Sequence, residues 1–236
     1  MSLYVYAITK TSHPLRLDGL KGVGEGASEL RVVRGDSLCA VVSEAPADLS
    51  VARRNLEAHH TVQERLWSDG VSLPLGFGFV AQDDDAVRVV LEQGADQYTQ
   101  RMAELADRVE FNVKGVQDED ALLRRIIEES DRIRELNEAT REGGRPEERM
   151  ELGQLVAQEV QAREEALATQ VVTALRPLAQ AESLSPSSEQ YFVNASFLVD
   201  DESSDDFTEA CGELAGQLPE GAELRLRGPL PPYSFA

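Results

Sequence analysis

The chain has 236 residues, of which 42% are hydrophobic and 28% are charged, and its formal net charge is −20. That length and apolar content suffice for one large or two small domains with buried cores. The strong negative charge argues against nucleic acid and anionic membranes as partners, because an acidic surface repels both.

The first 107 residues are predicted to form a modified ferredoxin-like domain. Apolar runs and alternating apolar patterns predict four strands, at Leu3–Ile8, Glu29–Arg34, Leu38–Glu44 and Ser72–Val80. Ser50 suits the cap of a helix that ends near Ser68, and Asp83–Asp85 favour the start of another that continues to about Asp107. The resulting order is the βαββαβ plan with the loop Thr9–Ala27 in place of its first helix and one helix added.

Residues 108–236 are predicted to form a second domain, of the α+β type, with a long helical hairpin. Their net charge is −14, against −6 for residues 1–107, which favours two units with different surfaces. The predicted strands are Val109–Gly115, Tyr191–Asp200 and a last one from Leu224 onward. A helix is predicted before the last strand, and Glu182–Glu189 are predicted to be a Ser/Pro linker.

Two helices of this domain are predicted to pair as an antiparallel hairpin. Asp118 or Asp120 is expected to cap the first, whose apolar stripe extends to Leu136, and Pro146 opens the second, which ends near Pro177. About 30 residues make the second helix about 45 Å long, longer than the sheet beside it is wide. Part of it is therefore expected to project and to contact another molecule. The candidate partner-binding residues on it are Leu152, Leu155 and Val156.

The chain ends in an aromatic tail stiffened by three prolines between residues 229 and 232. Chain ends are usually polar and frayed, whereas this one carries Leu230, Tyr233 and Phe235. The prolines limit its freedom in the unfolded state, so the tail is expected to be docked. Two interpretations stay open. The tail docks on the chain's own core, or it is a hook for a partner protein with those three apolar residues as the contacts.

The sequence holds no convincing set of catalytic residues. Glu57, His60 and Glu64 share one face of a predicted helix and would suit a divalent cation, but an exposed face with a charge pair is the commoner explanation. The glycine-rich segment 22–26 is not followed by a capped helix that would hold a phosphate, and Gly76-Phe-Gly78 has no nucleophile between its glycines. We therefore expect no catalytic residues, no cofactor and no bound metal.

The sequence also predicts a cytoplasmic protein. Its two cysteines, Cys39 and Cys211, are too far apart to suggest a disulfide framework. Residues 1–8 lack the basic start of a signal peptide, and no apolar run approaches the length that spans a membrane. No membrane interaction is expected.

Eight short segments occur in the order found in one known family. They are Leu3–Ile8, Ala40–Glu44, His59-His60, Leu73–Gly78, Val109–Lys114, Glu148–Val156, Val193–Val199 and Gly228–Phe235. Together they resemble the GvpF/GvpL family of gas vesicle accessory proteins and cover nearly the whole chain. Two features depart from the family pattern. Gly76 stands where a basic residue is frequent, and the polar segment 142–146 replaces an aromatic, glycine-rich stretch.

The resemblance implies a two-domain protein with a non-enzymatic role in gas vesicle assembly, located in the cytoplasm and at the gas vesicle. Family members are thought to bind the very hydrophobic shell protein and other accessory proteins. An acidic escort fits this role, because its charge would keep the complex dispersed while an apolar groove or sheet edge grips the shell subunit.

Two other functions stay open. One is a small-molecule-binding regulatory module, by analogy with other ferredoxin-like domains. Stabilisation that grows with ligand concentration would favour it. The other is a divalent-metal enzyme that uses Glu57, His60 and Glu64, which bound transition metal in the purified protein would favour.

Overall fold

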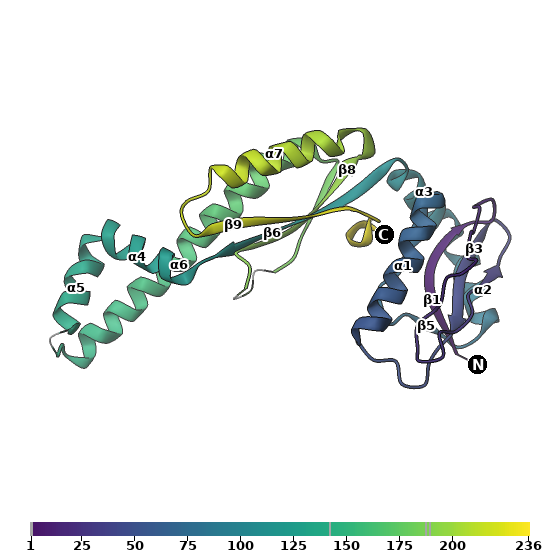
Figure 1. Cartoon of the computed structure of the whole chain (residues 1–236), viewed down its shortest axis with the longest axis horizontal. Coiled ribbons are helices and arrows are strands. Elements are labelled where there is room, and N and C mark those ends of the chain that lie inside the picture. The colour runs from purple at the N-terminus through teal and green to yellow at the C-terminus, as the bar shows by residue number, and fades with distance from the viewer. Residues whose placement is uncertain (1, 142, 187, 189) are drawn as a thin grey trace. The chain divides into compact units, whose positions relative to one another are not determined.

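The computed structural model describes residues 2–141, 143–186, 188 and 190–236 and consists of two compact units (Figure 1). The first unit contains Met1–Glu110 together with Pro229–Ala236, and the second contains Phe111–Gly228. The chain therefore leaves the first unit after Glu110 and returns to it after Gly228. The C-terminal tail, which we expected in the second domain, belongs to the first unit.

The first unit contains an antiparallel sheet with the strand order β2-β3-β1-β4, and β5 also pairs with β1. The strands are β1 Leu3–Lys10, β2 Arg31–Arg34, β3 Leu38–Glu44, β4 Ser72–Pro74 and β5 Val80–Ala81. This is the order of a ferredoxin-like sheet, with a loop where the first helix would stand. The strand predicted at Ser72–Val80 is formed only at its two ends, and residues 75–79 between them are irregular.

Helix α1 (Arg53–Asp69) covers one face of this sheet. Tyr4 and Tyr6 of β1 pack on this face in one cluster with Val62 and Leu66 of α1, and both tyrosines are fully buried. The helix begins later than predicted. Its cap residue is Ala52, which makes no side-chain cap hydrogen bond, and not Ser50.

Helices α2 (Asp84–Gln93) and α3 (Ala95–Leu105) cover the other face. The helix start predicted at Asp83–Asp85 is confirmed, and Asp83 is its cap, because the Asp83 side chain accepts a hydrogen bond of 2.9 Å from a backbone N–H in the first turn of α2. The single helix predicted here is wrong, since Gly94 interrupts it. The ring of Tyr98 folds over Gly94, where a Cβ would lie 2.3 Å from the ring.

The second unit contains a sheet with the order β7-β8-β6-β9. The strands are β6 Arg108–Gln117, β7 Ala181–Leu184, β8 Val193–Asp200 and β9 Ala222–Leu230. Helices separate β6 from β7, and α7 (Ser204–Gly216) separates β8 from β9. The two units therefore share one strand order, although the first has a loop where the second has helices and no repeat is evident in the sequence. A linker was predicted at Glu182–Glu189, but its first residues belong to β7, so that part of the prediction is wrong. Residues 187 and 189 lie outside the described residues.

The long helical hairpin is confirmed, but its first arm is broken. Helix α4 (Glu119–Glu129) is capped by Asp118, not Asp120, because the Asp118 carboxylate accepts a backbone hydrogen bond of 2.7 Å. Ser130 then separates α4 from α5 (Asp131–Arg141). With this break, both short helices contact the same partner helix.

That partner is α6 (Pro146–Leu175), a helix of 30 residues. Its first half packs against α4 and α5, and Figure 1 shows this helical end extending past the sheet of the same unit. The buried side chains are Leu122, Ile126 and Ile133, with Leu152, Leu155, Val156 and Val160 packed on them. Among the described residues, none of the helices combines the length and apolar character that crossing a membrane requires.

Candidate interaction surfaces

His59 of α1 fixes the irregular segment between β4 and β5. Its Nε2 donates a hydrogen bond to the carbonyl oxygen of Leu75 at 3.1 Å, so its Nδ1 is left to accept from the hydroxyl of Tyr4 at 2.9 Å. The Tyr4 oxygen in turn accepts the N–H of Gly78 at 3.2 Å. Gln63 donates a further hydrogen bond of 2.7 Å to the carbonyl of Leu75. The segment is thus held at both of its ends.

Burial fixes which groups of this hydrogen-bond network are protonated. His59 is 6% exposed, and desolvation lowers the pKa of its imidazole to about 4. Desolvation also raises the pKa of the Tyr4 phenol to about 12. At neutral pH the imidazole is therefore neutral and the phenol keeps its proton, as the hydrogen bond between them requires.

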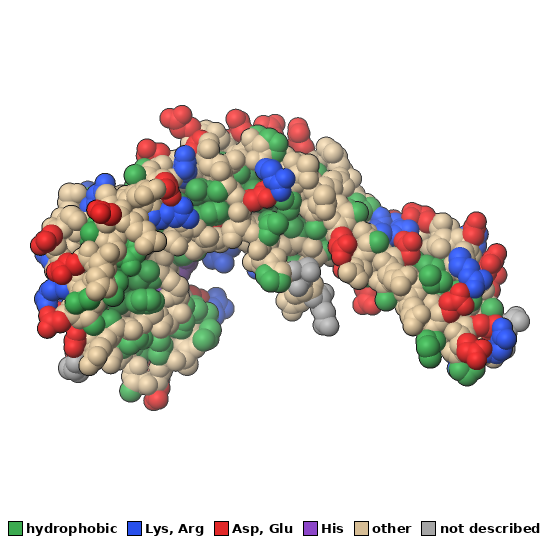
Figure 2. All heavy atoms as spheres, turned by 180° about the vertical axis from the view of Figure 1, so that it is seen from behind, with side chains coloured by type: hydrophobic (Ala, Val, Ile, Leu, Met, Phe, Trp, Pro, Cys, Tyr) green, Lys and Arg blue, Asp and Glu red, His purple; other side chains and the backbone are tan. Residues whose placement is uncertain are grey.

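The segment that His59 holds carries an exposed apolar surface. Phe79 is 48% exposed, and Val90 of α2 is 40% exposed. Together with Ala81 they line a cleft of about 100 Å³ whose other walls are apolar side chains of the sheet, α2 and α3. We call Phe79, Ala81 and Val90 the apolar patch. Figure 2 shows hydrophobic side chains gathered on the first unit, at the left of that view.

These three residues were not predicted as a site, although the sequence carries two signals of an uncovered apolar surface. Leu73, Leu75, Phe77 and Phe79 alternate over a segment too long for the short strand that forms. In α2, the run 87–91 contains four apolar residues, more than one buried stripe of a short helix needs. A surplus of this kind indicates apolar side chains that the chain itself leaves uncovered.

The C-terminal tail docks on the first unit. The backbone N–H and the hydroxyl of Ser234 donate to the two carboxylate oxygens of Glu110, each at 2.7 Å. Glu110 is 3% exposed and Phe235 is 5% exposed. Leu230, at the end of β9, is half-buried. In this conformation the Phe235 ring is covered, and the tail provides the hydrogen bonds that a buried carboxylate needs.

Of the three side chains considered as a metal site, two pair with each other and the third pairs with an arginine. Glu57 pairs with Arg53 at 2.6 Å, and the Nε2 of His60 donates to Glu64 at 2.9 Å. The Nδ1 of His60 then accepts the hydroxyl of Tyr233, 2.5 Å away. Across residues 2–141, 143–186, 188 and 190–236, no group of three or more His, Cys, Asp or Glu side chains is placed to hold a metal ion.

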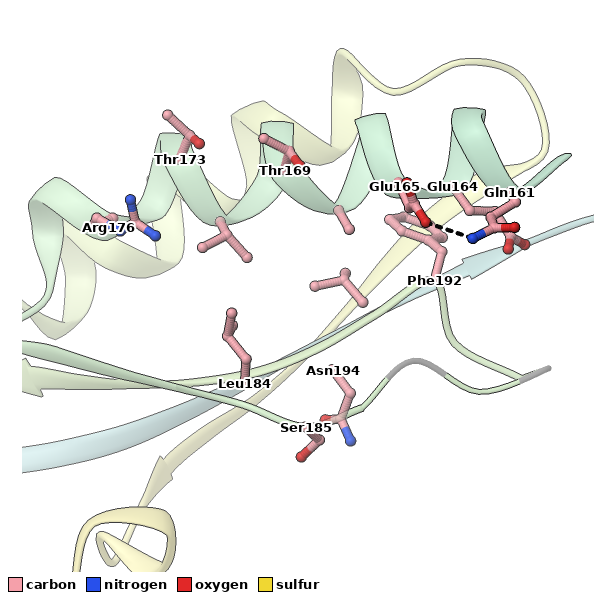
Figure 3. Close-up of a pocket in the computed structure, with 13 residues that line it drawn as sticks. Gln161, Glu164, Glu165, Thr169, Thr173, Arg176, Leu184, Ser185, Phe192 and Asn194 are labelled. Atoms are coloured by element: carbon pink, nitrogen blue, oxygen red, sulfur yellow. Dashed lines mark hydrogen bonds between the residues drawn. The ribbon is translucent and has the colours of Figure 1, made fainter. Parts of the chain in front are cut away.

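In the second unit, α6 is flanked by two hollows that share Gln161 and Glu164. One lies between α4 and α6, has a volume of about 560 Å³ and includes the candidate residues Leu152 and Val156 in its walls. The other lies between α6 and the strands β7 and β8, with a volume of about 680 Å³ (Figure 3). We call the two hollows together the α6 furrow. The remaining candidate on α6, Leu155, packs inside the hairpin.

The furrow has an apolar floor and an acidic rim. Burial raises the pKa of the Glu164 carboxyl, which lies where the two hollows meet. Gln161 donates a hydrogen bond of 2.8 Å to Glu165, as drawn in Figure 3. Arg176, at the far end, is already bound by both oxygens of Glu182, at 2.8 and 2.6 Å. The apolar residues of the floor include Leu123, Val160, Val172, Leu184 and Phe192.

Part of the floor of the furrow depends on a glycine. The ring of Phe192 lies over Gly115 of β6, where a Cβ would be 2.3 Å from the ring. Gly115→Ala is therefore expected to displace Phe192 and to lower the free energy of unfolding of the second unit by about 1–3 kcal/mol. Chemical denaturation followed by circular dichroism measures this loss. Gly153→Ala is the control, because a Cβ at that position meets no atom within 4 Å, and equal stability of the two variants would contradict the close packing.

Comparisons with known proteins agree over the full length of the chain. The family model "Gas vesicle synthesis protein GvpL/GvpF" matches residues 2–236. Gas vesicle protein F of a Streptomyces species is 39% identical and is aligned over 100% of this chain and 99% of its own length. Gas vesicle protein F of Dolichospermum flosaquae is 30% identical over 99% of this chain and 97% of its own length.

Solved structures agree with these sequence relatives. The crystal structure of GvpF from Anabaena sp. PCC7120 matches with a TM-score of 0.81 and 26% identity, over 99% of this chain and 97% of that one. The crystal structure of GvpF from Microcystis aeruginosa has the same fold, with a TM-score of 0.79 and 24% identity over 99% of this chain and 98% of that one. The chain is thus a gas vesicle accessory protein and belongs to the GvpL/GvpF family.

Proposed function

We propose that the chain has a non-enzymatic role, in which it binds the hydrophobic shell protein and other accessory proteins during gas vesicle assembly. It would act in the cytoplasm and at the growing vesicle. Membership of the GvpL/GvpF family supports the setting. The net charge of −20 supports the role of escort, since it would keep a complex with an apolar subunit dispersed.

The observation that carries this proposal is the apolar patch beside its cleft. Phe79 and Val90 are both large apolar side chains that the chain leaves about half exposed. Burying each of them against a partner would contribute about 1–2 kcal/mol. The hydrogen bonds of His59 and Tyr4 fix the backbone next to Phe79, so little conformational entropy is lost on binding. A hydrophobic shell subunit has the surface that such a patch would cover.

Phe79→Ser and Val90→Ser are each expected to weaken binding of purified shell protein by about tenfold, and the double variant by about a hundredfold. Each substitution removes apolar area from the patch and leaves the hydrogen bonds of His59 in place. Retention of shell protein on immobilised variant protein, measured over a concentration series, gives the affinities.

Val51→Ser is the matched control for the patch. Val51 is 76% exposed, and it does not line the cleft. This variant is expected to bind shell protein as the unaltered chain does. Equal affinity of all four variants and the unaltered chain would overturn the assignment of the patch, and no retention by the unaltered chain would overturn the proposed function itself.

A further inference from the structure

The α6 furrow has the shape and charge of a docking groove. We propose that it binds a basic amphipathic helix of a partner protein, with the apolar face of that helix against the floor and its lysine or arginine side chains against the acidic rim. This inference goes beyond the proposed function, because it concerns the second unit and a partner recognised by charge as well as by apolar contact.

The floor of the furrow allows a helix to approach closely. Gly153 and Ala157 lie one turn apart on α6, and both line the hollow between α4 and α6. A Cβ built at Gly153 meets no atom within 4 Å, so the space above this position is open. From Arg149 to Arg176 the lining residues extend over about 40 Å of helix, enough for several turns of a second helix at the usual packing distance of about 8–10 Å.

The charge of the furrow selects the occupant. Glu119, Glu164 and Glu165 contribute three carboxylates to its rim. The lining also contains two basic residues, Arg149 and Arg176. Arg149 is 15 positions before Glu164 on α6, and the charge of Arg176 is already balanced by Glu182. The described part of the chain offers Glu164 no hydrogen bond or ion pair, and its carboxyl is partly dehydrated. A cation brought to Glu164 by a partner would supply the missing counter-charge.

The same charge argues against other occupants. The second unit, residues 111–228, has 12 basic and 26 acidic side chains, a net charge of −14. A second copy of this chain, a nucleic acid or an anionic lipid surface would all be repelled. A purely apolar helix would fill the floor but would leave the rim carboxylates facing a low-dielectric surface, which costs free energy. A helix with both apolar and basic faces avoids both penalties.

The test uses the full chain and a dye-labelled synthetic peptide of about 18 residues, long enough for several turns. The peptide carries leucine on one face and lysine on the flanks, and a matched peptide carries glutamate in place of lysine. Fluorescence anisotropy is expected to give at least tenfold tighter binding of the lysine peptide, and added salt is expected to reduce the difference. Equal binding of the two peptides would overturn the proposed charge recognition.

Variants then place the peptide in the furrow. Gly153→Gln fills the groove and is expected to weaken binding of the lysine peptide at least tenfold, whereas Glu164→Gln is expected to weaken it about fivefold. Gly212→Gln on α7 is the matched control. Its added side chain also meets open space, and both substitutions favour the helix over glycine, so stability should not fall in either. Unchanged binding in Gly153→Gln would overturn the site.

A further measurement separates this inference from the proposed function. Phe79→Ser is expected to leave peptide binding unchanged while it weakens binding of shell protein. A photocrosslinker at Ala157, on the exposed side of α6, in cells that make vesicles is expected to label a basic helical segment of another protein. Labelling of a second copy of this chain or of an acidic segment would overturn the choice of occupant.

Discussion

A chain that lacks Tyr233–Ala236 is expected to lose at least about 3 kcal/mol of the free energy of unfolding of its first unit. The deletion removes both Ser234 hydrogen bonds from Glu110, a carboxylate that is 3% exposed. It also removes the buried ring of Phe235 and leaves a cavity in its place. Urea unfolding followed by the fluorescence of Trp67 measures the loss, because Trp67 is the only tryptophan of the chain and lies in α1 of this unit.

Glu110→Gln separates the two contributions to this loss. A neutral amide is less costly to leave without partners than a carboxylate, so the same deletion is expected to cost about 1–2 kcal/mol less in the Glu110→Gln background. Equal costs in the two backgrounds would assign the whole effect to Phe235. Unchanged unfolding of the shortened chain would contradict the docked tail and would favour the alternative in which the tail is a hook for a partner.

Local sequence signals predicted most elements of the fold. The apolar runs at Leu3–Ile8 and Leu38–Glu44 form β1 and β3, and Asp83 and Asp118 cap helices as their position before an apolar periodic stretch indicates. These features depend on neighbours in the chain. They need no knowledge of what packs against them, which is why the sequence reveals them.

The errors arose where side-chain packing or strand pairing decides the local structure. The helix predicted to continue after α2 is interrupted at Gly94, over which the Tyr98 ring folds. The segment predicted as a linker begins as β7 because β8 offers it an edge to pair with, in the register Ala181 to Leu198. Neither the orientation of the Tyr98 ring nor the edge that β8 offers follows from the apolar pattern of the sequence.

The candidate surfaces were predicted only in part, for the same reason. The apolar stripe that contains Leu152 and Val156 indicated a buried helix face. Its residues contribute both to the core of the hairpin and to the furrow. Which part of the stripe stays exposed depends on the position of α4, which the sequence does not give. His59 and Leu75 lie in two of the segments that carry the family resemblance, His59-His60 and Leu73–Gly78. Their hydrogen bond, which holds the start of the segment that ends at Phe79, joins residues 16 positions apart.

Acidification from pH 6.5 to pH 4 is expected to destabilise the first unit through His59. The imidazole has a pKa of 6.5 in its unperturbed state and of about 4 in the folded chain, because burial disfavours its charged form. Between these values the unfolded state binds a proton that the folded state does not, so the free energy of unfolding falls as the pH falls. The shift corresponds to at most about 3 kcal/mol, with no loss above pH 6.5 and the full loss at pH 4 and below.

His59→Gln isolates this contribution, because glutamine does not titrate. Carboxylates that lose favourable partners in acid, such as Asp84, whose pKa Arg31 lowers, are present in both proteins and cancel in the comparison. Urea unfolding at a series of pH values, read from Trp67, is expected to show the stability advantage of the unaltered chain shrinking from pH 6.5 to pH 4. A constant difference would contradict a buried neutral imidazole. Since that imidazole holds the segment that bears Phe79, binding of shell protein is expected to weaken over the same range of pH.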